Sequence, residues 1–127
     1  MKNLKEKIKE IEQLISFDYS EMQGWAALRK FVLNKEVVFQ NGIRNFKIIE
    51  TDKLIRLITT IPPLQTFEVH WHDCGERIEV LAGEMGDKLT NRIFETNENI
   101  VYSKGERHQP FNPSSFNHCI VLVDFYR

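Results

Sequence analysis

Two histidines separated by a single residue, with an acidic residue shortly after them, are the part of this sequence best suited to catalysis or ligand binding. His70 and His72 are followed by Glu76, four residues after His72. On a β-strand successive side chains alternate between faces, so residues two apart lie side by side on the same face. Two buried imidazoles on one face are costly unless they bind something, and imidazole is a good ligand for divalent transition metals. The spacing therefore predicts a metal site.

Three more residues are candidates for the same pocket. Glu76 shares the parity of the two histidines, and residues 77–81 continue as a strand pattern that would turn its carboxylate back toward them. His108 follows a glycine by three residues at the end of a short strand, a place from which its ring can enter the mouth of a barrel. Glu68 has the parity of His70, and we consider it a candidate general base or a hydrogen-bond partner of the ligands. The alternative for Glu68 is a solvated carboxylate at the rim.

Cys74 lies inside this cluster, and Cys119 is the only other cysteine. Two cysteines in a domain with its own core do not make a disulfide framework. We interpret Cys74 as a buried or half-buried free thiol. The alternative is a thiolate ligand or a redox-sensitive neighbour of the metal.

Length and composition indicate one folded domain. The chain has 127 residues, of which 42% are hydrophobic, enough for a core. The formal net charge is −1, with 17 basic and 18 acidic side chains, which argues against a nucleic-acid-binding role. There is no apolar run of about 18 residues, so no membrane span is expected. The charged first residues lack an apolar signal region, so we expect a cytoplasmic protein.

Residues 1–36 are predicted to form two α-helices. Apolar residues recur at helical spacing in the first helix, at Leu4, Ile8, Ile11 and Ile15. Ser20 resembles an N-cap with Gln23 three residues later, as in a capping box, and a second apolar stripe follows. We expect this helical segment to pack on the rest of the domain, with a dimer contact as the alternative.

From residue 37 onward the pattern changes to short strands separated by turns. The predicted strands are 37–40, 46–50, 54–61, 65–72, 76–82, 91–95, 99–103 and 117–126, with turn residues between them. Many short strands favour a sandwich or a barrel. In 65–72 strict alternation would place Phe67, Val69 and Trp71 on the outer face. Such an apolar row needs a cover, which the N-terminal helices or a second subunit would supply.

The two clusters of candidate residues resemble the paired motifs of the cupin superfamily. The first motif, a His-x-His pair followed by a glutamate and, after six intervening residues, a glycine, is matched by His70, His72, Glu76 and Gly83. The second is matched by Gly105, His108 and Asn112. Ser103 stands where the family usually has proline, at a turn position that is not a ligand. The resemblance covers roughly residues 50–125 and leaves the N-terminal helices outside.

The resemblance implies a mainly β fold, a double-stranded β-helix (jelly-roll) barrel over residues 37–127. With the helical segment 1–36 it would form one structural domain. The resemblance also implies one divalent metal ion, held by His70, His72, Glu76 and His108. Such a ligand set does not choose among Fe, Mn, Ni, Co and Zn. A barrel that has kept its histidines without a metal is the alternative.

The cupin fold does not fix a function, because the family includes oxygenases, isomerases, decarboxylases and non-enzymatic binding domains. Our first hypothesis is a mononuclear metal-dependent dioxygenase that acts on a small molecule. The first alternative is a non-catalytic small-molecule binding or sensing module. The second is a metal-dependent sugar isomerase, which would need several basic residues near the motifs, where only Arg77, Lys104 and Arg107 stand out. We expect a homodimer without a nucleic-acid or membrane partner.

Overall fold

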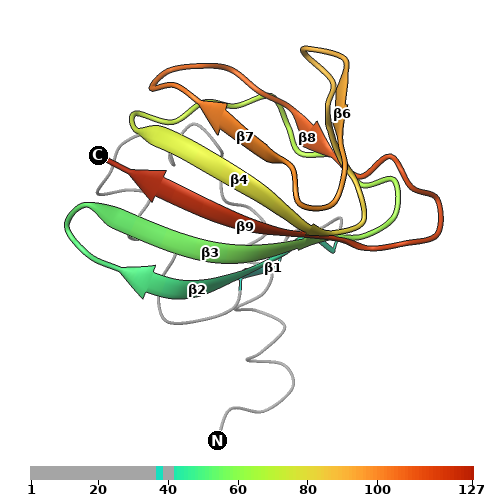
Figure 1. The fold of residues 1–127 in the computed structure, drawn as a ribbon, viewed down its shortest axis with the longest axis horizontal. Helices are drawn as coiled ribbons and strands as arrows, with labels where there is room; N and C mark the ends of the chain where they lie inside the picture. The colour runs from blue at the N-terminus through green and yellow to red at the C-terminus, as the bar shows by residue number, and fades with distance from the viewer. Residues whose placement is uncertain (1–36, 39–41) are drawn as a thin grey trace, which may run out of the picture.

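The computed structural model describes residues 37–38 and 42–127, and in that part every regular element is a β-strand (Figure 1). The strands are β1 (Val37–Val38), β2 (Arg44–Glu50), β3 (Leu54–Ile61), β4 (Gly75–Ala82), β5 (Met85–Asp87), β6 (Arg92–Phe94), β7 (Asn99–Tyr102), β8 (Pro110–Phe111) and β9 (Cys119–Tyr126). The two helices predicted for 1–36 lie outside the described residues. Within those residues, no helix has the length and apolar character needed to cross a membrane.

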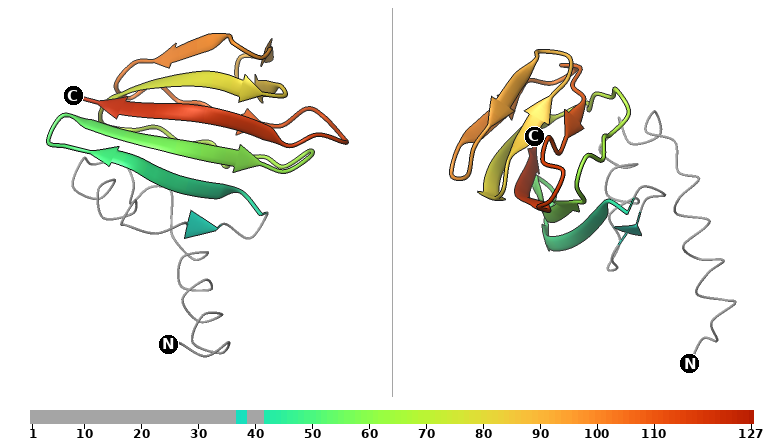
Figure 2. Two further views of the ribbon diagram at one scale, coloured as in Figure 1. Left: turned by 60° about the horizontal axis from the view of Figure 1, so that its bottom comes forward. Right: turned by 90° about the vertical axis from the view of Figure 1, so that its right-hand side faces the viewer.

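The strands form two antiparallel sheets. The larger sheet has six strands in the order β1-β2-β3-β9-β4-β7, and the smaller has three in the order β6-β5-β8. Figure 2 shows the long, twisted larger sheet with the shorter strands lying over one of its faces. The apolar core contains residues of both sheets, such as Ile55 and Val121 from the larger and Met85 and Phe94 from the smaller. The mainly β fold predicted from the strand pattern is therefore confirmed for the described residues.

The long strands follow the expected alternation of buried and more exposed side chains. In β3, the residues Ile55, Leu57, Thr59 and Ile61 are buried, and the residues between them are partly exposed. Strand β9 carries apolar residues on both faces. Its inner row, which includes Val121 and Val123, is buried, whereas Ile120 and Leu122 on the outer face are partly exposed.

The predicted strand over 65–72 is wrong. This segment makes only two isolated bridges, Thr66 with Phe111 and His70 with His108. It follows Pro62 and Pro63, which cannot donate to a ladder, and Leu64 has a left-handed φ of 62°, so the chain cannot enter as a regular strand. Strict alternation fails as a result: Phe67 packs against the core, and Val69 is exposed.

Other elements also differ from the expectation. Strands β5 and β8 were not predicted, because each is only two or three residues long and lies within a segment rich in turn residues. Strand β9 begins at Cys119, so His118 precedes it and is exposed. These short elements matter because the loop between β7 and β8 carries His108.

Candidate metal centre

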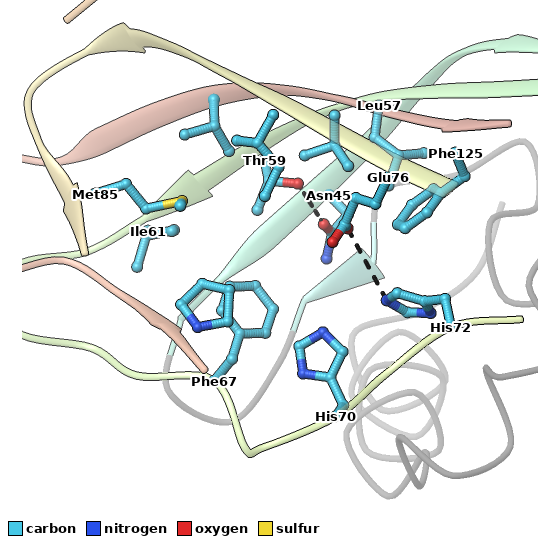
Figure 3. Close-up of a pocket in the computed structure, with 14 residues that line it drawn as sticks. Asn45, Leu57, Thr59, Ile61, Phe67, His70, His72, Glu76, Met85 and Phe125 are labelled. Carbon is cyan, nitrogen blue, oxygen red and sulfur yellow. Dashed lines mark hydrogen bonds and ion pairs between the residues drawn. The ribbon is translucent and has the colours of Figure 1, made fainter. Parts of the chain in front are cut away.

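Three histidines from the two motifs converge in the interior. His70, His72 and His108 are buried, and one ring nitrogen of each lies within 4.8 Å of the others (Figure 3 shows His70 and His72). A reciprocal pair of backbone hydrogen bonds fixes the two segments: His70 N donates to His108 O at 3.1 Å, and His108 N donates to His70 O at 3.0 Å. Gly105 N also donates to His72 O at 2.8 Å. The second motif is thereby held directly against the first.

Backbone carbonyls orient two of the imidazole rings in the same way. His70 Nδ1 lies 2.7 Å from the carbonyl oxygen of Glu68, and His108 Nδ1 lies 3.1 Å from that of Glu106. A carbonyl can only accept, so each Nδ1 carries the proton and donates it. Each Nε2 is then the ring nitrogen that can bind a metal ion, which is the usual arrangement of metal-binding histidines.

Glu76 lies among these rings, on an inward position of β4. Its Oε1 lies 3.0 Å from His108 Nε2, and its Oε2 lies 3.9 Å from His72 Nε2. Although they are close, Glu76 Oε1 and His108 Nε2 are both buried without a hydrogen bond of acceptable geometry in the described part of the chain. Buried polar atoms without a partner are rare and costly, and an ion is one of the few explanations.

The donor set fits a divalent ion. Nitrogen and carboxylate ligands lie about 2.1 Å from such an ion, so two ligands of one ion are at most about 4.2 Å apart. The two contacts of Glu76, at 3.0 and 3.9 Å, satisfy this limit. The three histidine nitrogens, within 4.8 Å of one another, need only a small inward movement.

Electrostatics keep His70 neutral and Glu76 charged. Burial, with the neighbouring His108 and His72, lowers the pKa of His70 to about 3, so this ring is neutral at physiological pH. Burial would raise the pKa of Glu76, but the charges of the histidines, His108 foremost, hold it at about 2. Burial likewise opposes protonation of His108, yet the Glu76 carboxylate raises its pKa. A proton on His108 is thus the competitor of a metal ion.

Two buried residues that the sequence analysis did not identify, Tyr102 and Asp87, hold His108 in place. The ring of Tyr102 stacks on that of His108, with centroids 4.2 Å apart and planes 16° apart. Tyr102 donates its hydroxyl hydrogen to Asp87 Oδ2 at 2.8 Å. Asp87 Oδ1 accepts from the backbone N–H groups of Leu89 at 3.0 Å and Gln109 at 3.1 Å. Tyr102 could have been found by its inward parity on β7, but nothing local marks Asp87.

The structure also shows the environments of the other candidate residues, Asn112, Glu68 and Cys74. Asn112 is buried and organises the loop after β8: its Nδ2 donates to Ile61 O and Asn117 O, and its Oδ1 accepts from Ser114 N. Glu68 is exposed, and only its carbonyl contacts His70. Cys74 is a buried free thiol, as predicted, and burial raises its pKa to about 12.

A cavity of about 50 Å³ adjoins the cluster and is lined by residues of both sheets (Figure 3). It is lined by Asn45, Leu57, Thr59, Ile61, Phe67, His70, His72, Glu76, Ile78, Met85, Pro110, Val121, Val123 and Phe125. Its titratable lining groups are His70, His72 and Glu76, and neither lysine nor arginine is among the described residues that line it. Glu68 is exposed and is not in this lining, which fits the alternative of a solvated carboxylate at the rim.

Comparison with solved structures identifies the class of fold. An RmlC-like cupin from Shewanella frigidimarina is 13% identical with a TM-score of 0.65, over 72% of this chain and 82% of that one. A protein with a cupin-like fold from Ralstonia eutropha is 14% identical with a TM-score of 0.61, over 68% of this chain and 56% of that one. The polyketide cyclase RemF from Streptomyces resistomycificus is 23% identical with a TM-score of 0.60, over 66% and 64%.

The chain therefore has the cupin fold, and the resemblance inferred from its two motifs is confirmed at the level of the fold. The matched region spans little more than half of the Ralstonia protein and under two thirds of the cyclase. No protein-family model and no curated protein matches the sequence.

Proposed function

We propose that this protein is a mononuclear metal-binding cupin in which His70, His72, Glu76 and His108 hold one divalent ion. The observation that carries the proposal is the convergence of buried nitrogen lone pairs on a buried carboxylate, where Glu76 Oε1 and His108 Nε2 lack hydrogen bonds. The ion would supply Lewis-acid or redox chemistry to a small molecule in the adjoining cavity. We infer that the activity is that of a metal-dependent oxygenase.

The chain's own groups would bind and shield such a ligand. The apolar lining, which includes Phe67 and Phe125, excludes water around the centre and strengthens its electrostatics. Glu76 brings negative charge, and neutral His70 brings a lone pair without a competing proton. The structural similarity to a polyketide cyclase supports chemistry on a small organic molecule in this fold.

A non-catalytic binding or sensing module is the second candidate, and one observation favours it. Apart from the candidate metal ligands, the described residues lining the cavity include no acid or base. General acid–base catalysis would need such a group within hydrogen-bond reach of the ligand. A sugar isomerase is less well supported, because a phosphorylated sugar needs basic side chains, and none is among those lining residues.

Metal analysis tests the proposal. Freshly purified wild-type protein, prepared without oxygen, should contain close to one divalent ion per chain by elemental mass spectrometry. His70→Ala and His108→Ala should each lose most of it while circular dichroism shows a folded barrel. His118→Ala, which removes an exposed histidine, is the matched control and should retain the metal. Equal metal in wild type and both ligand variants would refute the ligand assignment.

The identity of the metal separates the two candidates. Iron together with oxygen consumption in the presence of a ligand favours the oxygenase. Zinc without turnover favours the binding module.

A further inference from the structure

One polar pair interrupts the apolar wall of the cavity. Asn45 on β2 and Thr59 on β3 lie directly opposite each other, and Thr59 Oγ1 donates to Asn45 Oδ1 at 2.7 Å. Both are buried, at 5% and 3% exposure, and both line the cavity. Figure 3 shows them on the side of the cavity away from Phe67 and His70. Apart from this pair and the candidate metal ligands, every described lining residue is apolar.

The Nδ2 group of Asn45 is a hydrogen-bond donor that is not used within the described residues. Thr59 engages its oxygen, and no hydrogen bond involves Asn45 Nδ2 in the part of the chain that the structure describes. An apolar pair would pack in the same place without the cost of removing an amide from water. The amide lines the cavity, so an acceptor oxygen of a ligand in the cavity can pair with this unused N–H donor.

We propose that Asn45, oriented by Thr59, hydrogen-bonds an acceptor oxygen of the small molecule that this site binds. This inference rests on the proposed function, because it assigns a different group of that molecule to the metal centre. The ligand class is a compact molecule with an apolar body, an anionic oxygen group for the ion and a second, neutral oxygen for Asn45. No lysine or arginine is among the described lining residues, so that second group is a carbonyl or hydroxyl rather than a phosphate.

The size of the cavity restricts the ligand further. Its volume of about 50 Å³ is far below the roughly 300 Å³ at which sites for drug-sized ligands begin. The part of the ligand that enters has only a few heavy atoms. One hydrogen bond is then a large share of the recognition, and its loss is measurable.

Matched pairs of short acids test the inference. Propanoate is compared with 3-hydroxypropanoate, and pentanoate with 4-oxopentanoate, so that an acceptor oxygen is added at two distances from the carboxylate. Binding to Co²⁺-loaded and metal-free protein is measured by calorimetry and ligand-observed NMR. At least one acid with the added oxygen should bind wild-type protein about tenfold more tightly than the matched acid without it. Asn45→Leu, which is nearly isosteric, should abolish this preference while leaving the metal content and the affinity for the plain acid unchanged.

Two further variants control for packing. Thr59→Val should reduce the preference because the amide loses its anchor, whereas Thr60→Val makes the same change on the outer face of β3 and should have no effect. Asn45→Asp replaces the donor with an acceptor and should disfavour the oxygen-bearing acid. The inference is overturned if neither pair shows a preference in wild type, or if the preference survives in Asn45→Leu.

The result is distinguishable from failure of the proposed function. If wild-type protein binds no metal, the proposed function fails, and the preference measured in metal-free protein alone decides the role of Asn45. If metal binds normally and no preference is found, only the role of Asn45 is refuted.

Discussion

At the scale of single residues, the ligands of the candidate metal centre are oriented by backbone groups more than by other side chains. Glu68 and Glu106 each lie two positions before a histidine, and each orients that histidine through its carbonyl oxygen. Both glutamate side chains are exposed, so these residues contact the rings through their backbone. The imidazole positions therefore follow from the local path of the chain, which the reciprocal bridge between His70 and His108 maintains.

The buried titratable groups give the metal-free protein a characteristic pH dependence. Unfolded His70 takes up a proton near pH 6.5, whereas the folded residue, with its pKa lowered to about 3, does not. The free energy of unfolding should therefore fall below pH 6.5 by up to about 1.4 kcal/mol per pH unit. His108 has the opposite effect because its pKa is higher in the folded protein than in the unfolded chain. Its contribution to the free energy of unfolding is complete below pH 6.5 and is lost as the pH rises through its pKa in the folded protein. We expect maximum stability near pH 6.5.

Urea denaturation in the presence of EDTA, from about pH 5 to pH 8, measures this profile. Glu76, with its pKa lowered from 4.5 to about 2, adds a further loss only below pH 4.5, outside the range. His70→Gln should remove the decline on the acid side. His118→Gln, at an exposed position, should leave the profile unchanged. An equally steep acid decline in His70→Gln would contradict the assignment.

At the scale of elements, one glycine of the first motif is needed for close packing. Gly83 has a φ of +75°, and a Cβ there would lie 2.8 Å from the carbonyl oxygen of His118. Gly105 has a similar φ of +79° but open space around the position of a Cβ. Gly105→Ala should therefore cost only the conformational strain, about 1–2 kcal/mol, and Gly83→Ala should cost clearly more. Thermal and urea unfolding of both variants measure the difference, and equal losses would show that the close approach is unimportant.

The carboxylate of Asp87 joins β5 to the loop that carries His108. Asp87→Ala removes acceptors for Tyr102, Leu89 and Gln109, so we expect metal affinity to fall about tenfold or more. Competition with a chromophoric chelator measures the affinity. Asp73→Ala is the control: Asp73 follows His72 directly but only forms an exposed ion pair with Lys104, which contributes little. Unchanged affinity in a folded Asp87→Ala variant would refute this positioning role.

The sequence was informative where the pattern was local. Strands β3 and β4 alternate regularly because one face of each is buried, and the metal ligands stand out because their spacing lies within two short motifs. Asp87 and Asn45 could not be found in this way. Asn45 meets Thr59 only through the register of β2 against β3, which shifts between Lys47 and Ile49, and no local pattern encodes such a register. The segment 65–72 was mispredicted for a related reason, since its conformation depends on bridges to distant residues.

At the scale of the whole molecule, the outer face of the larger sheet has an apolar row. Phe46, Ile58 and Leu122 are successive partners across β2, β3 and β9. Phe46 is 39% exposed, and the other two are partly exposed. An apolar row of this kind on a regular sheet is a surface on which a second copy of the chain would bury its own row. This row, rather than residues 67–71, is therefore the surface on which we base the expectation of a homodimer.

We accordingly predict that wild-type protein has a mass in solution of twice the 15.0 kDa of one chain, measured by light scattering after size-exclusion chromatography. Phe46→Lys should shift the mass toward one chain, because a charge at the row cannot be buried without a partner. Phe116→Lys is the matched control: Phe116 is 88% exposed in a loop, so the same substitution there should leave the dimer intact. A dimer that survives Phe46→Lys would place the contact elsewhere. A wild-type mass of one chain would show that the row needs no second copy.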